Sequence, residues 1–323
     1  MPNFNKFMQF KILVMLILFG VVSGVSGCSS SGNVSSLSKL RNMSSGDDDK
    51  LINEFTISTS PGLTLDVKCD AGSVKIKPGS DNQVRVRVYG DDETYNKIED
   101  KAEKTPEGVE ITSKIKDEYK HNKNGWNLRM RMEIEVPSNY NVKVKTGGGS
   151  VSVSDLRGAV NVNTGGGAVS IESIIGDVAI NTGGGSIKVN NNTGDLAINT
   201  GGGAVKLSGF DGNVAVNTGG GSVSMDGSNG QVDVVTGGGS ISLEYSGSNK
   251  GVNLSTGGGS ISLKIPSDFA ADLDLYTGVG SISTDFGKPE KDGMSSTLKT
   301  QINGGGDEVV CHTGAGSIRL SKK

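Results

Sequence analysis

The chain has 323 residues, 50 of them glycine and only 5% aromatic, and its 32 basic and 35 acidic side chains leave a net charge of −3. Charge this close to balance gives no reason to expect nucleic acid as a partner. The length allows one large all-β unit or two ordinary domains, and the regular alternation of apolar residues between the glycines excludes low-complexity filler.

Residues 1–27 predict a signal peptide. Lys6 and Lys11 give a basic start, and residues 12–22 form an apolar core of 11 residues, too short to span a bilayer as a helix. Residues 25–28, Val-Ser-Gly-Cys, resemble a bacterial lipobox. That resemblance implies cleavage before Cys28 and attachment of acyl chains such as palmitate to it, a stable anchor in the membrane. Ordinary secretion without lipid on Cys28 is the alternative.

Residues 28–52 are rich in Ser, Gly and Asp and predict a lipidated, flexible tether. Residues 53–145 predict an irregular N-terminal cap with early repeats, in which Cys69 occupies the position that threonine takes later. Within this part, residues 91–104 are charged and place Tyr95, Ile98 and Ala102 at helical spacing, which predicts a short surface helix. Trp126 is expected to plug the open end of the core.

The strands of this front part carry basic residues at their outward positions. If the strands are neighbours, these residues form a cationic strip that could meet phosphates of a glycolipid or an acidic polysaccharide. The alternative is a solvated face balanced by Glu133, Glu135 and the acidic segment 91–110. The candidate residues are Lys75, Lys77, Arg85, Arg87, Arg129, Arg131, Lys143 and Lys145.

From residue 146 onward, one sequence motif repeats. Thr-Gly-Gly-Gly begins at Thr146 and returns every 18 residues as far as Thr236, and further copies follow after gaps of 20, 21 and 36 residues. A fixed period of this size is typical of stacked repeats, none of which can bury its apolar face alone.

Each repeat contains two short segments of alternating apolar residues, as in 150–153 and 159–163, separated by turns. Such alternation predicts half-buried strands. Coiling would pair each strand with its counterpart one repeat later, in parallel and about 4.8 Å away. The sequence therefore predicts an all-β fold, a parallel β-helix or β-solenoid over 146–323 built from two-strand turns of about 18 residues, here called rungs.

The corners between strands are predicted to be structural. Three consecutive glycines indicate either backbone angles open only to glycine or backbones stacked too closely for a Cβ. The preceding threonine points inward, so its hydroxyl could bond the corner. One position earlier, asparagines should form an outward ladder of amides; they are Asn163, Asn181, Asn199 and Asn217.

At the far end, Val309 and Cys311 keep the inward alternation, and residues 285–307 predict an insertion with a degenerate rung at 297–302. Cys69 and Cys311 should be at least nine rungs apart, about 40 Å at the usual strand spacing. That exceeds the roughly 7 Å limit between the Cα atoms of a disulfide, so both should be buried free thiols.

The succession of rungs, ending in GGGDEVVCHTGAGSIRL, resembles the bacterial putative-adhesin family over residues 53–323. This family is related to head domains of autotransporter adhesins. The resemblance implies a β-solenoid at a bacterial surface and implies no catalytic residues.

Few residues offer other chemistry. The glycines are followed by a strand rather than a helix and lysine, which argues against phosphate binding, and the corners lack the carboxylates of calcium-binding repeats. A carbohydrate-active β-helix enzyme would need clustered carboxylates with basic partners. Only His121 and His312 are present, and the outward carboxylates fall one to a rung; they include Asp155, Glu172, Asp177, Asp195 and Asp211.

The sequence thus predicts a lipid-anchored protein of the cell envelope, at the outer membrane or cell surface, that acts as an adhesion or scaffolding solenoid. Expected partners are the membrane, through the anchor, and a polysaccharide, glycolipid or another surface protein; no cofactor, metal or nucleic acid is expected. The alternatives are a carbohydrate-active enzyme and a purely structural envelope protein.

Overall fold

A computed structural model describes residues 49–120 and 128–323, together with the backbone of β1 (Ser35–Ser36). The predicted signal peptide, Cys28, His121 and Trp126 lie outside these residues. Within the described part of the chain, no helix has the length and apolar character needed to cross a membrane.

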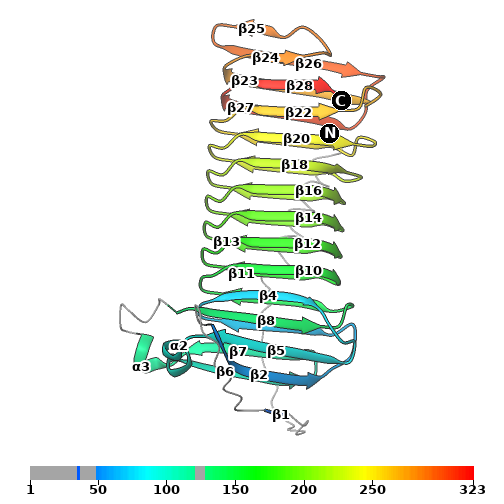
Figure 1. The fold of residues 1–323 in the computed structure, drawn as a ribbon. Coiled ribbons are helices and arrows are strands. Elements are labelled where there is room, and N and C mark those ends of the chain that lie inside the picture. The colour runs from blue at the N-terminus through cyan, green and yellow to red at the C-terminus, as the bar shows by residue number, and fades with distance from the viewer. Residues whose placement is uncertain (1–34, 37–48, 121–127) are drawn as a thin grey trace. The chain divides into compact units, whose positions relative to one another are not determined.

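Two sheets of 14 strands each make up the fold, and every central rung gives one strand to each sheet (Figure 1). In the first, called the A sheet, the central strands are β10 (Val151–Arg157), β12 (Val169–Ile175), β14 (Ile187–Thr193), β16 (Val205–Asp211), β18 (Val223–Ser228), β20 (Ile241–Ser246) and β22 (Ile261–Ile265). In the second, the B sheet, they are β9 (Asn141–Thr146), β11 (Val160–Thr164), β13 (Val178–Thr182), β15 (Leu196–Thr200), β17 (Val214–Thr218), β19 (Val232–Thr236) and β21 (Val252–Thr256). All these strands pair in parallel, which confirms the predicted β-solenoid.

The register follows the repeat. Val151 pairs with Val169, and Val169 with Ile187, each exactly one 18-residue period along the chain. Inward residues therefore stack on residues of the same kind, and nearly all of the apolar ones are less than 2% exposed. Burying this apolar surface contributes about 25 cal/mol for each Å² removed from water, which is the main favourable term for each added rung.

The A-sheet strands continue through the segment predicted as a turn. In β10, β12, β14 and β16, one residue per strand adopts a left-handed backbone, such as Asp155 with φ of 58°, and the alternation shifts by one position there. The next residue then points inward and closes that side of the core with a fifth buried side chain. In successive rungs these side chains are Leu156, Ile174, Asn192 and Phe210. Asn192 is the polar exception.

Close stacking explains the corner glycines. A Cβ on Gly183 would lie 2.2 Å from the Gly165 carbonyl oxygen, and one on Gly185 would lie 1.9 Å from that of Gly167. The middle residue, Gly184, has nothing within 4 Å of its Cβ position. Of the two explanations offered by the sequence, contact between stacked backbones therefore accounts for the first and third glycines of this corner.

Both polar rows have the structural roles predicted for them. The Thr182 hydroxyl is buried and accepts a hydrogen bond from the Gly185 N–H at 3.3 Å, inside its own corner. Asn181 donates from Nδ2 to Oδ1 of Asn163 at 3.2 Å, and Asn199 donates to Asn181 at 3.0 Å. Each amide in the ladder thus ties one rung to the next.

At the N-terminal end, the first rung along the chain, β3 (Thr64–Cys69) and β4 (Ser73–Pro78), is not the outermost rung, because β7 (Gly108–Ile115) and β8 (Met130–Val136) lie outside it. β3 pairs in parallel with β7 and with β9, and β4 with β8 and with β10. Antiparallel strands cover β7 and β8 in turn: β5 (Gln83–Gly90) pairs with β8 and β2 (Lys50–Ser58) with β5 in the A sheet, and β6 (Ile98–Thr105) pairs with β7 in the B sheet. β1 pairs with β2.

The predicted helix over 91–104 is only partly correct. Helix α2 spans Asp92–Lys97, with Asp91 as its N-cap, and a second short helix, α3, spans Asp117–Lys120. Tyr95 is helical, whereas Ile98 and Ala102 belong to strand β6 and are buried. A spacing of four residues places two side chains on one face of a strand as well as of a helix, so the spacing alone could not distinguish them.

The C-terminal end repeats this arrangement. The last rung, β27 (Glu308–Ala315) and β28 (Ile318–Lys322), lies between the rung of β21 and β22 and the rung of β23 (Ala271–Val279) and β24 (Ile282–Thr284). Residues 297–302, predicted as a degenerate rung, instead belong to β26 (Ser295–Ile302), which pairs antiparallel with β23 and with β25 (Glu290–Asp292).

Cys69 and Cys311 are buried free thiols, as predicted. Eight strand steps separate β3 from β27 in the B sheet rather than nine, because both terminal rungs are tucked inside the stack. At about 4.8 Å per step the separation is about 38 Å. Burial raises the pKa of the Cys311 thiol to about 12.

Candidate anion-binding face

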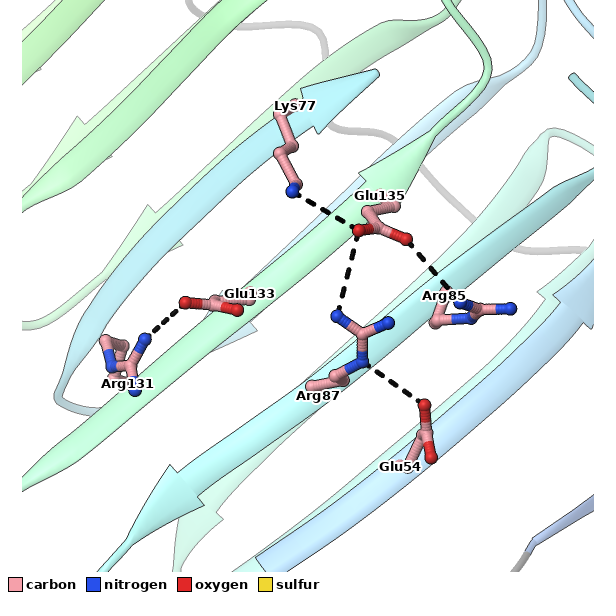
Figure 2. Close-up of polar contacts among 7 residues, drawn as sticks. All are labelled: Glu54, Lys77, Arg85, Arg87, Arg131, Glu133 and Glu135. Carbon is pink, nitrogen blue, oxygen red and sulfur yellow. Dashed lines mark hydrogen bonds and ion pairs between the residues drawn. The ribbon is translucent and has the colours of Figure 1, made fainter. Parts of the chain in front are cut away.

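The structure divides the eight basic candidates among the two sheets and the region of helix α2. Lys75 and Lys77 on β4, Arg85 and Arg87 on β5, and Arg131 on β8 share the outward face of the A sheet near its N-terminal end. Figure 2 shows most of this group, with the glutamates that lie among it. The five side chains that the A sheet brings together are called the A-face basic cluster.

Strand β8 lies between the two basic strands and carries the carboxylates. Glu135 is 3.4 Å from Lys77 Nζ on one side, and on the other side it is 3.7 Å from Arg87 and 3.9 Å from Arg85 (Figure 2). Arg87 also contacts Glu54 of β2, with 3.3 Å between Nε and Oε1. Cationic and anionic strands therefore alternate across this face.

Arg131 is held by neighbours on three sides. It pairs with Glu133, lies 3.7 Å from Asp49, and places its guanidinium 4.4 Å from the centre of the Tyr89 ring. Burial lowers the pKa of Arg87, but Glu54 and Glu135 outweigh burial and raise that pKa above its ordinary value. Their neighbours thus partly fix the positions of both arginines.

The balance of charge on this face is small. The A-face basic cluster exceeds the three glutamates by two positive charges, or by one when Asp49 is included. Ion pairs at such partly exposed positions contribute about 0–1 kcal/mol each. Lys75 lies opposite Glu133 in the register, and the described residues make no ion pair with it, so it is the cation of this cluster most available to a ligand.

The other candidates lie elsewhere. Lys143 and Lys145 point outward from β9 of the B sheet, where their register partners on β3 are Asp66 and Lys68. Lys68 was not among the predicted residues, although it continues this second basic group; it pairs with Asp66 at 3.3 Å and with Glu110 at 2.7 Å. The alternation of β3 in the sequence places Lys68 on the outward face. The sequence does not show which side chains of neighbouring strands lie beside it.

Arg129 precedes β8 and lies near helix α2. Hydrogen bonds from Thr94 lower the pKa of the Asp91 carboxyl, and the charge of Arg129 adds to this effect. The predicted strip of eight residues is therefore distributed over the A face, the B face and the region of α2.

Two of the outward carboxylates, Asp177 and Asp195, accept hydrogen bonds from the backbone of the next rung. Asp177 accepts a hydrogen bond from the Asp195 N–H at 3.0 Å, and Asp195 accepts one from the Asn213 N–H at 3.0 Å. They form a vertical row that joins successive corners. Across residues 49–120 and 128–323, no three His, Cys, Asp or Glu side chains are grouped so as to hold a metal ion.

Residues 63–320 match the family described as Toastrack DUF4097, which confirms the resemblance that the repeats indicated. Among solved structures, the chain is similar to a putative adhesin from Bacteroides fragilis NCTC 9343, with 15% identity over 84% of this chain and 98% of that chain and a TM-score of 0.40. It is also similar to a putative cell adhesion protein from Clostridium sporogenes ATCC 15579, with 14% identity, coverage of 84% and 99%, and a TM-score of 0.22. A comparison with curated proteins gives no match.

Proposed function

The chain belongs to the Toastrack DUF4097 family, and from that premise we propose that it is an exported lipoprotein of the cell envelope whose β-solenoid serves adhesion or scaffolding. The observation that supports this most is the stack of rungs itself, whose strands pair in parallel from β9 to β22. Its outward faces carry short polar side chains at a regular spacing, such as the ladder from Asn163 to Asn217. A surface ordered before binding loses little conformational entropy when a partner docks.

The anchor is proposed at Cys28. Cells making the chain should incorporate a palmitate analogue into it, and Cys28→Ser should abolish both the label and sedimentation with the outer membrane. Cys69→Ser is the matched control, because it also removes one cysteine but should keep the label. Labelling that persists in Cys28→Ser would contradict the lipid anchor.

The adhesion role is tested with whole cells. Cells that display the chain should attach to immobilised polysaccharides, glycolipids or surface proteins more strongly than cells without it, and external protease should remove the solenoid. Equal attachment across such a panel, with the protein intact at the surface, would contradict adhesion and leave scaffolding within the envelope.

We propose the A-face basic cluster as the contact for anionic groups, with Lys75 and Lys77 the residues to test. The double variant Lys75→Gln with Lys77→Gln should weaken binding to an acidic polysaccharide such as polygalacturonate, most clearly at low salt, where exposed charges are least screened. Lys188→Gln with Lys206→Gln is the matched control, since both lysines point outward from the same sheet on β14 and β16. An equal loss in both double variants would indicate general charge attraction rather than this cluster.

A further inference from the structure

We propose that a shallow hollow on the B sheet, near its C-terminal end, binds one ring of a neutral glycan. This inference rests on the proposed surface role and supplies a ligand class for it. The hollow has a volume of about 330 Å³ and lies over strands β19, β21, β27 and β23. That volume falls at the lower end of the range for small-molecule sites, about 300–1,000 Å³.

Four outward residues in one row form the hollow. Val235 pairs with Ser255, Ser255 with His312, and His312 with Tyr276. This row continues the asparagine ladder, so the amides give way here to a small hydroxyl between an aliphatic and two aromatic side chains. Val235, His312 and Tyr276 form the walls of the hollow. The smaller Ser255 lies between Val235 and His312.

Two of the three bulky residues expose apolar surface, which is uncommon on this otherwise polar face. Val235 is 39% exposed and Tyr276 is 42% exposed. The ring of Tyr276 packs edge to face on His312, with 5.9 Å between ring centres and an interplanar angle of 78°. This contact fixes the tyrosine, so that a ligand would meet an aromatic surface already held in place.

The charges at this site are already paired. Asp274 lies 2.8 Å from Lys299 Nζ and 3.4 Å from His312 Nε2. Burial raises the pKa of Asp274, but Lys299 and His312 outweigh burial and hold that pKa below its ordinary value. A charged ligand would therefore find the charges of Asp274 and Lys299 already compensated by each other. A neutral ligand with many hydroxyls would keep the pairs intact.

A sugar ring in the pyranose form matches this combination. Its C–H faces are apolar and suit Tyr276 and Val235, while its rim of hydroxyls suits Ser255 and the polar groups beside it. The two strand steps from Val235 to His312 span about 10 Å, which is wide enough for one such ring. A peptide adding as a strand would need a free sheet edge, and this face offers none because its strands are paired on both sides.

The test measures binding of the full chain to tetrasaccharides of glucose, mannose and N-acetylglucosamine, with tetragalacturonate as the acidic probe. At least one neutral probe should bind, and Tyr276→Ala should weaken that binding by about tenfold, the loss expected when one aromatic contact is removed. Tyr276→Phe should retain it, and Val235→Asn, which restores the ladder residue, should weaken it. Tyr95→Ala is the matched control, because Tyr95 is also exposed but lies on helix α2.

Three results would overturn the inference: no binding of any neutral probe by the folded chain, binding of the acidic probe alone, or neutral binding that Tyr276→Ala leaves unchanged. The proposed surface role fails separately. If cells displaying Tyr276→Ala attach as well as the parent, adhesion stands and this site is wrong. If neither cell line attaches but the purified chain binds the sugar, the site stands and the adhesion role is wrong.

Discussion

Two adjacent glycines in one corner should respond very differently to alanine. Gly185→Ala places a Cβ 1.9 Å from the Gly167 carbonyl oxygen, whereas Gly184→Ala places one in open space. Both substitutions add the same methyl group, both positions lie in the same turn, and neither backbone is in the left-handed region. The comparison therefore isolates the effect of contact between stacked rungs.

The expected loss for Gly185→Ala can be worked from the contacts around it. Overpacking of a well-filled site costs about 1–3 kcal/mol. A displaced corner also weakens the hydrogen bonds from Gly183 N–H to the Thr164 carbonyl, at 3.2 Å, and from Gly201 N–H to the Thr182 carbonyl, at 3.1 Å. Each bond is worth about 0.5–1.5 kcal/mol. The free energy of unfolding should fall by about 2–6 kcal/mol.

For Gly184→Ala we expect a change within about 1 kcal/mol, on the stabilising side, because alanine restricts the unfolded chain and meets no neighbour in the folded one. Urea unfolding followed by circular dichroism compares the two variants. Amide hydrogen exchange in β13 and β15 shows whether the disturbance is local, since repeat arrays can unfold in several steps. Equal unfolding midpoints, or a larger loss for Gly184→Ala, would refute the reasoning from stacked backbones.

Three further outcomes are expected. Asn192 donates to the Gly194 carbonyl at 2.9 Å, but its Oδ1 is buried and has no partner among the described residues; Asn192→Leu keeps the shape and should raise the free energy of unfolding by about 1–3 kcal/mol, measured by urea unfolding. Burial raises the pKa of Asp100 in the folded chain, so the stabilisation it gives is complete below its unfolded pKa and is lost as the pH rises through the folded pKa. Urea midpoints measured across that range should fall less in Asp100→Asn than in the parent, and parallel pH profiles would show that Asp100 is not the cause. Cys69 and Cys311 should react with a thiol reagent only when urea unfolds the chain, since both are buried; rapid reaction of either thiol in the native protein would contradict that burial.

Much of the fold could be predicted from local pattern. An 18-residue period and strict alternation require each strand to pair with its counterpart, because only then does every rung find an apolar partner surface. The inward threonines, the asparagine ladder and the free thiols follow from the same register. Local pattern failed at residues 98–102, where helical and strand spacing coincide, and at Asp155, where one left-handed residue changes which side chains point inward.

The candidate sites depended on which strands become neighbours. The basic residues at alternate positions of β4 and β5 were visible in the sequence, but the acidic strand β8 comes between them only because β4 of the first rung pairs with residues 58 positions later. Likewise His312 of β27 contacts Tyr276 of β23, which precedes it by 36 residues. The two meet because the last rung lies between the rung of β21 and the rung of β23.

The sequence by itself determined the repeating unit, its inward and outward faces and the stacking of like residues, because these depend on contacts one period apart. Only the tertiary structure decided the order of rungs at the two ends, and with it the charge pattern and the hollow. Strands at the ends satisfy the same alternation in several orders, and the choice among them is made by long-range packing that no local pattern records.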